Sequence, residues 1–325
     1  MNEGNKSLLI YIPCHSDFDL AINQAKKIKN EFKEDSKDIS RFISKIDIAI
    51  SVNNFEPSKS QLDQAALVSD LIINRNKLFL ADANIANGFM VGYQRKVDFL
   101  WILSANDELL ESGFSKMVKS LSNEIDLLVT CLPEVSQVSS INNVIDPPMN
   151  GYSFGLISGV IYNCQTLSEF FNVSEFFIWT GWCQLSVIQN AINQKNSLKI
   201  RTVNTFEIYK QRQTKANKLA NKYGHSFYGY MILGYVFAKT KKAKKKFIRH
   251  YIFQNTFKIH LYRRKSFHTS QVIDPNNYLA WNQDIAEAII KRVSLSVYFF
   301  YCIVIRLPFY FLREFLNEQP ESYES

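Results

Sequence analysis

The segment ANIANGFMVGYQRKVDFLWILSANDELLESG, residues 83–113, contains the pattern that decides the fold. It begins with a helical pattern over 84–96 and continues into the apolar run Phe99–Leu103, which is typical of a buried strand. The polar residues Asn106, Asp107 and Glu108 follow this run. A helix that leads into a buried strand is typical of sheets in which helices and strands alternate, and ligands bind at the carboxyl ends of their strands.

The same alternation extends through the first 205 residues. Short apolar runs at 8–12, 46–52, 78–81 and 127–131 predict further buried strands. Helical patterns lie between them, over 16–28, 60–73 and 112–122. We therefore expect a doubly wound α/β fold for residues 1–205.

The chain changes character after about residue 205. An aromatic run leads to KTKKAKKKFIRH at 239–250, and no comparably clear strand pattern follows. We expect residues 206–325 to form a separate, mainly helical C-terminal region. No internal repeat is visible.

Charge divides the chain in the same way. Residues 1–200 hold 17 Lys and Arg against 22 Asp and Glu, a net charge of −5. Residues 201–325 hold 21 against 8, a net charge of +13. Such a basic segment suits nucleic acid, anionic lipid or phosphorylated substrates. Because no nucleic-acid recognition motif is present, we do not expect a nucleic-acid partner.

Several classes of protein are disfavoured by missing motifs. The five cysteines are widely spaced and form no C-x-x-C pair, which argues against a structural zinc site. No Walker-type loop and no G-x-G-x-x-G motif occur, which argues against kinases and dehydrogenases. The first residues, MNEGNKS, lack the basic start of a signal peptide, so we expect a cytoplasmic protein.

The apolar segment at 293–312 bears on membrane association. It is twenty residues long, but Arg306 and Pro308 interrupt it, and a spanning helix needs about 20 largely apolar residues. An interfacial helix and a buried core helix are both better interpretations than a span. The cationic run at 241–249 favours the interfacial one, with the protein peripheral on the inner face of the cell membrane.

The polar cluster after the strand at 99–103 admits two interpretations. Asn106, Asp107 and Glu108 offer the oxygen ligands that Mg²⁺ and Mn²⁺ prefer, and such ions commonly share ligands with a diphosphate. The same residues could instead form an Asx turn that caps the next helix.

Four ordered segments resemble family 2 glycosyltransferases, which have the GT-A fold. They are LLIYIPCHSDFDLAINQA (8–25), IAISVNNFEPS (48–58), NIANG (84–88) and WILSANDELLESG (101–113). GLISGVIYNCQTL (155–167) is similar to the acceptor-side strand and turn of that family. The resemblance implies a GT-A Rossmann-like mixed sheet and transfer of a sugar from a nucleotide-sugar, UDP-linked, with inversion.

The resemblance also implies roles for individual residues. The residues it places around the nucleotide are Pro13, His15, Asn53, Asn54, Asn84 and Asn106. Asp107 takes the position of the charged metal ligand, with Mg²⁺ or Mn²⁺ as the cofactor. Asn106 stands where the family has a second acid, which weakens the cation site or makes the metal dispensable.

The general base departs most from the family pattern. An inverting transfer needs a carboxylate near the acceptor hydroxyl, to take its proton as the new bond forms. The family supplies it at the start of a helix, but here that helix opens with Gly181, Trp182 and Cys183. Glu175 is the nearest carboxylate and is the catalytic residue we predict, the alternative being an exposed loop acid.

Two classes of function follow from these observations. The first is a glycosyltransferase whose acceptor is a lipid-linked or growing surface glycan, as in the assembly of capsule or lipopolysaccharide. The second is a non-catalytic GT-A-like binding protein in a membrane or glycan-assembly complex, which the missing general base and Asn106 favour. The helical region could also pack against a second copy as a homodimer.

Overall fold

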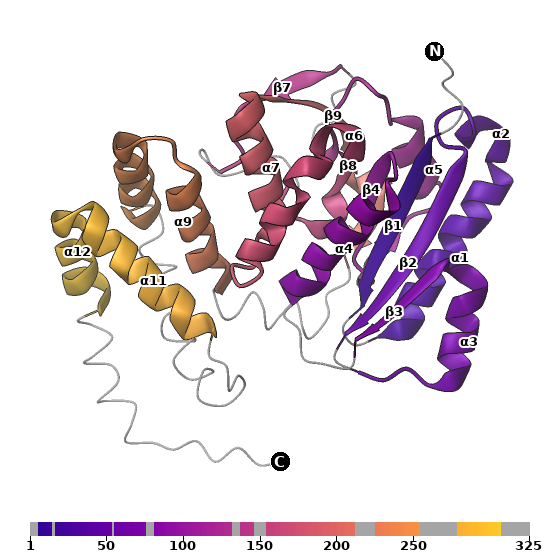
Figure 1. Cartoon of the computed structure of the whole chain (residues 1–325), viewed down its shortest axis with the longest axis horizontal. Coiled ribbons are helices and arrows are strands. Elements are labelled where there is room, and N and C mark those ends of the chain that lie inside the picture. Colours follow the sequence, from indigo (N-terminus) through magenta and orange to yellow (C-terminus); the bar gives the residue numbers. More distant parts are fainter. Residues whose placement is uncertain are drawn as a thin grey trace. The chain divides into compact units, whose positions relative to one another are not determined.

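The structure is a computed structural model that describes residues 6–14, 17–53, 55–75, 81–131, 137–145, 154–211, 225–253 and 278–306. The chain divides into two compact units, Met1–Thr214 and Lys215–Ser325. Figure 1 shows strands in the first unit and helices in the second.

A mixed sheet forms the centre of the first unit. Within the described residues it has eight strands, in the order β3 (Leu71–Arg75), β2 (Lys45–Asn53), β1 (Ser7–Cys14), β4 (Phe99–Ile102), β8 (Val160–Asn163), β6 (Leu127–Cys131), β9 (Leu198–Asn204) and β7 (Ser139–Ile141). Strands β3, β2, β1 and β4 run parallel, whereas β8 is antiparallel to both of its neighbours. This arrangement confirms the predicted α/β fold class.

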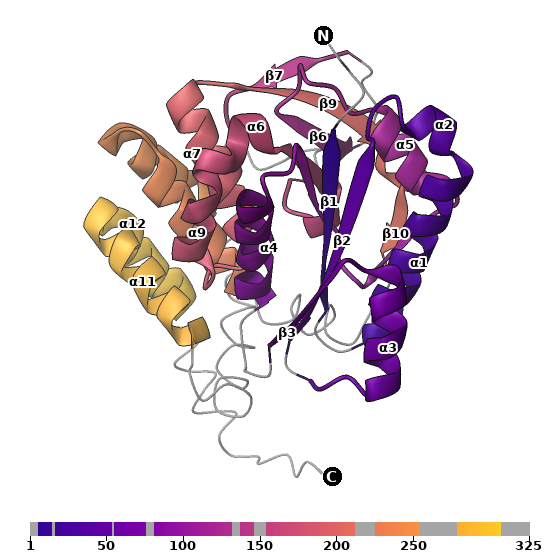
Figure 2. The same ribbon diagram turned by 45° about the vertical axis from the view of Figure 1, so that its right-hand side comes forward.

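Helices cover both faces of this sheet (Figure 2). One face carries α1 (Phe18–Glu34), α2 (Ser36–Ile39), α3 (Lys59–Val68) and α5 (Gly113–Lys119). The other carries α4 (Ala81–Arg95), α6 (Cys164–Leu167) and α7 (Cys183–Lys195). The short helices η1 (Ile157–Gly159), η2 (Ser168–Phe177) and η3 (Thr205–Glu207) connect elements, and β5 (Asp107–Leu109) pairs with β10 (Tyr209–Gln211).

Local sequence explains where α1 begins. The side chain of Asp17 accepts a hydrogen bond from the Leu20 backbone N–H at 3.3 Å, which is a typical N-cap. Apolar side chains then recur at helical spacing and are buried against β1 and β2, among them Phe18, Ile22 and Ile28. The helix predicted over 16–28 is confirmed and continues to Glu34.

The third strand lies earlier in the chain than predicted. Helix α3 ends at Val68 because Ser69 is extended, with φ −126° and ψ 156°. The apolar residues that follow it pair with β2 as β3, so the helix predicted over 60–73 is too long. Of the strand predicted at 78–81, residues 78–80 lie outside the described residues and Ala81 begins α4, so that prediction is wrong at Ala81.

The described parts of the second unit are helical, as predicted. They are α9 (His225–Phe237), a helix at 241–253, α11 (Tyr278–Val293), α12 (Leu295–Phe300) and the π-helical η4 (Tyr301–Arg306). Gly234 allows the close approach of the Phe247 ring, which would overlap any Cβ at this position. The rings of Tyr230 and Tyr251 stack with their centroids 5.6 Å apart.

The apolar segment at 293–312 does not form one continuous α-helix. Its described part is divided by Ser294 into the end of α11 and the pair α12 and η4, and residues 307–312 lie outside the described residues. Within the described ranges, no helix combines the length and apolarity needed to cross a membrane.

Candidate functional site

The candidate site lies where three parallel strands end. Register pairs Cys14 of β1 with Val52 of β2, and the Leu103 backbone N–H donates to the Tyr11 carbonyl at 2.9 Å. The carboxyl ends of β1, β2 and β4 therefore share one edge of the sheet. This edge brings together the predicted site residues Pro13, Asn53, Asn106 and Asp107, whereas His15 and Asn54 lie outside the described residues.

Asn84 connects α4 to the strands just below this edge. Its Oδ1 accepts a hydrogen bond from Tyr11 Oη at 2.7 Å, and its Nδ2 donates to the Ser51 carbonyl at 3.3 Å. Asn87 Nδ2 also donates to Tyr11 Oη, at 2.8 Å. A Cβ on Gly88 would lie 2.7 Å from the Tyr11 ring, so the glycine is needed for this close packing. The described contacts of the Asn84 amide are thus with the protein, through a tyrosine that sequence reasoning missed.

Asp107 is the buried acid of the site. Its side chain is 7% exposed, and its Oδ2 accepts a hydrogen bond from Ser158 Oγ at 2.5 Å. Ser158 Oγ in turn accepts the Ser104 backbone N–H at 2.9 Å, and its carbonyl accepts Trp101 Nε1 at 2.9 Å. Burial raises the pKa of Asp107 to about 6, against the opposing effect of the Ser158 hydrogen bond.

Few protein groups at this edge could act as ligands of a divalent cation. Asp107 supplies one carboxylate, and Asn106 beside it is half-buried. In the described parts of the chain, no group of three or more His, Cys, Asp and Glu side chains is placed to hold a metal ion. Such a site fits Mg²⁺ or Mn²⁺ only if a diphosphate and water supply most of the ligands, which is common for Mg²⁺.

Helix α1 fixes the segment that carries Asp107. The Gln24 side chain donates to the Asp107 carbonyl and accepts the Leu109 N–H at 3.3 Å, and Lys27 Nζ donates to the Leu109 carbonyl at 2.6 Å. A pocket of about 100 Å³ lies between the two elements, lined by Leu20, Asn23, Gln24, Lys27, Ala105, Asp107, Glu108 and Leu109. Asp107 therefore belongs to both the sheet edge and this pocket.

Glu175, the predicted base, is exposed within η2. Trp179 and Trp182 are half-exposed, and Trp179 Nε1 donates to the Phe176 carbonyl at 2.9 Å.

A second buried acid holds the start of α7. Asp82 is 7% exposed and accepts the backbone N–H groups of Gly181, Trp182 and Cys183, the last at 3.3 Å. Gly181 has a φ of 78°, a conformation that favours glycine. Burial raises the pKa of Asp82 to about 7, although the three N–H groups act in the opposite direction. No sequence signal links Asp82 to α7, which has no side-chain N-cap of its own.

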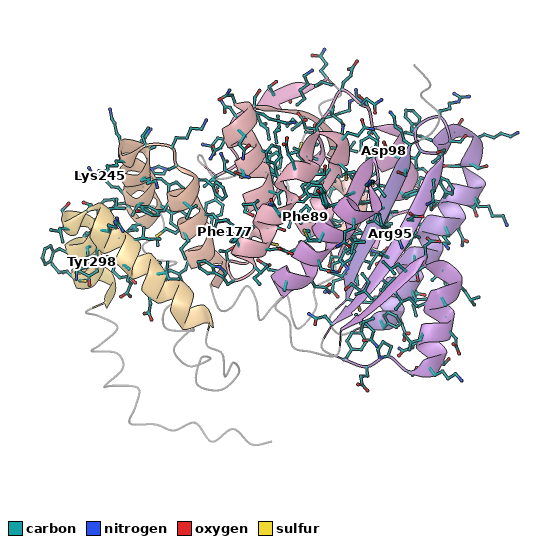
Figure 3. All side chains as sticks on the ribbon, viewed as in Figure 1. Phe89, Arg95, Asp98, Phe177, Lys245 and Tyr298 are labelled. Atoms are coloured by element: carbon teal, nitrogen blue, oxygen red, sulfur yellow. The ribbon has the colours of Figure 1, made fainter. Side chains whose placement is uncertain are left out.

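The packing behind the edge is aromatic. Phe89 lies between Tyr162 and Phe171, with centroid distances of 5.0 Å to each ring, and is labelled in Figure 3. These rings pack α4 onto β8 and η2 and thereby fix both Asn84 and Asp82, which lie on α4.

Comparison with solved structures supports the type of fold. The fold is of the GT-A type. S. aureus TarS 1-349 in complex with UDP-GlcNAc is similar, with a TM-score of 0.51, 12% sequence identity and coverage of 90% of this chain and 82% of that one. The same TarS fragment in complex with UDP has a TM-score of 0.51 at 12% sequence identity, and the match covers 98% of this chain and 94% of the TarS fragment. A longer TarS structure gives 0.50 at 9% identity, and the match covers 54% of its length.

No protein-family model matches the chain, and no curated protein matches it.

Proposed function

We propose that this protein is a glycosyltransferase that takes a sugar from a UDP-linked nucleotide-sugar and transfers it to a glycan acceptor, with inversion of the anomeric centre. The observation that carries the proposal is a buried acid, Asp107, held by Ser158 at the edge where β1, β2 and β4 end. Ligands of open α/β sheets bind at this edge. The proposal is supported by the likeness to TarS, which was crystallised with UDP-GlcNAc and with UDP.

In this proposal, each residue of the edge has a task. Pro13 and Asn53 border the base, and Asn106 and Asp107 face the diphosphate. Mg²⁺ or Mn²⁺ held by Asp107 supplies neutralisation of the diphosphate charge when bound. Glu175 takes the proton of the acceptor hydroxyl, because an inverting transfer needs a base on the acceptor side.

The role of Asp107 can be tested by calorimetry of UDP binding in the presence of Mn²⁺. The Asp107→Asn variant keeps an oxygen that can accept the Ser158 hydrogen bond but removes the charge. We expect its affinity for UDP to fall by about tenfold in Mn²⁺ and to match the wild type in EDTA.

Asp63→Asn is the matched control, since Asp63 is an exposed carboxylate on α3. It should bind UDP as the wild type does. If Asp107→Asn retains full affinity for UDP in Mn²⁺, Asp107 is not the cation ligand.

We further propose that the acceptor is a lipid-linked or growing surface glycan at the inner face of the membrane. The support comes from the second unit, where Leu295, Phe299 and Ile303 are 60%, 61% and 62% exposed. Their i, i+4, i+8 spacing places them on one face of the α12 and η4 segment. An exposed apolar ridge in a unit rich in lysine is typical of interfacial helices.

Flotation with vesicles of phosphatidylcholine and phosphatidylglycerol tests this attachment. At low salt we expect the full chain to float with these vesicles, and the double variant Phe299→Ser/Ile303→Ser to lose at least about half of the bound fraction. Leu67→Ser removes an apolar side chain of α3 that is 80% exposed, more than those of Phe299 and Ile303, and should change nothing. A full-length protein that stays in the soluble fraction would contradict the membrane proposal.

A further inference from the structure

The second unit contains a basic pocket on the helix at 241–253. Its volume is about 430 Å³, which is within the range of small-molecule sites. The side chains that line it are Lys242, Lys245, Lys246, Arg249, His250 and Phe253. Lys245 is labelled in Figure 3.

Helical spacing selects these residues from a longer lysine run. Positions 242, 245, 246, 249, 250 and 253 follow the i, i+3, i+4 repeat of one helix face. The other lysines do not line the pocket: Lys244 lies over the Tyr235 ring, 4.5 Å from its centroid, and Lys239 and Lys241 are exposed elsewhere. The pocket therefore concentrates one part of the charge, and the rest of the run provides an internal comparison.

The helix that carries the pocket residues is packed against the rest of the second unit. Phe247, Ile248 and Ile252 are buried on the opposite face of the helix. At the pocket, the Phe253 ring packs on Phe300 with a centroid distance of 4.6 Å, and the Arg249 guanidinium lies 5.8 Å from the Phe253 centroid. The cations are thus presented by an anchored helix.

The charge of the pocket is one-sided. Residues 238–253 contain no Asp or Glu. Within the described residues, none of the Lys and Arg side chains of the pocket forms an ion pair with a carboxylate. Like charges at i, i+3 and i+4 repel one another, so a bound anion would relieve a repulsion that the protein itself leaves in place.

We infer that this pocket binds a multiply charged phosphate group, such as a diphosphate. Lysine binds phosphate as a point charge and arginine can bind it through two parallel hydrogen bonds, so several such cations match a diphosphate better than a single carboxylate. The phosphate could belong to a lipid or to a soluble ligand, since the recognising chemistry is the same. The inference goes beyond the proposed transfer reaction and needs neither donor nor acceptor.

The test is calorimetry of inorganic pyrophosphate binding to the full chain at low ionic strength without divalent cations. The double variant Lys245→Ala/Lys246→Ala should bind pyrophosphate on the order of tenfold more weakly than the wild type. The matched variant Lys239→Ala/Lys241→Ala loses the same charge and should stay within about twofold. Circular dichroism checks whether both variants are folded.

Uridine affinity on the same proteins separates this inference from the proposed donor site. Uridine carries no phosphate, so the pocket variant should bind it as the wild type does. If pyrophosphate releases the protein from phosphatidylglycerol vesicles, the pocket binds a lipid phosphate. If pyrophosphate binds the protein but does not release it from the vesicles, the pocket binds the phosphate of a soluble ligand. Equal loss of pyrophosphate affinity in both double variants, or no loss in the pocket variant, would overturn the inference.

Discussion

Two of the buried carboxylates in the first unit, Asp107 and Asp82, bear on the candidate site at the scale of single residues. Asp107 accepts a hydrogen bond from one hydroxyl group and belongs to the candidate donor site. Asp82 accepts hydrogen bonds from three backbone N–H groups at the start of α7. Burial raises the pKa of both, to about 6 and about 7. Because both carboxyls keep their protons to a higher pH in the folded protein than in the unfolded chain, both link stability to pH.

The Asp82 linkage has a definite sign. Between the ordinary value of 3.8 and about 7, the folded state holds a proton that the unfolded state releases. The contribution of Asp82 to the free energy of unfolding is complete below pH 3.8. It decreases by at most about 1.4 kcal/mol per pH unit as the pH rises from 3.8 to about 7, and it no longer changes above that pH. Asp107 acts in the same direction up to about pH 6.

We therefore expect Asp82→Asn to become more stable relative to the wild type as pH rises from 4.5 to 7.5. The reason is that asparagine cannot ionise, while it retains an oxygen for the N–H groups of α7. Urea unfolding at several pH values measures the difference. Asp63→Asn, an exposed control, should show little change with pH, and a constant difference for Asp82→Asn would contradict the raised pKa.

At the scale of elements, local pattern predicted much of the fold. Helix α1 carries its own N-cap in Asp17, and β1, β2, β4 and β6 are rich in apolar residues, so these elements were predictable. Strand β3 was missed because the apolar residues at 71–73 continue the helical pattern of α3, and the break at Ser69 depends on backbone pairing with β2.

The candidate site was predictable to a smaller extent. Asp107 could be predicted because it lies in the polar cluster a few residues after the buried strand β4. Its partners Ser158 and Gln24 lie 51 and 83 residues away in sequence, and only the folded chain brings them together. Asp82 was missed for the same reason, since it caps a helix that begins 101 residues later.

At the scale of the whole molecule, the division of charge follows the division of chemistry. The acidic N-terminal part, with a net charge of −5 over 1–200, contains the sheet edge and its buried acid. The basic part, with +13 over 201–325, contains the phosphate pocket and the exposed apolar ridge. A nucleotide-sugar donor that binds together with a divalent cation is compatible with the acidic first part. A negatively charged partner is compatible with the basic second part.

The central claim is that a nucleoside diphosphate binds at the carboxyl ends of β1, β2 and β4. Hydrogen–deuterium exchange of the full chain with and without saturating UDP and Mn²⁺ tests it most directly. The account predicts slower exchange in peptides that cover 12–14, 50–53 and 103–109. Unchanged exchange in all three peptides, or protection confined to other parts of the chain, would contradict it.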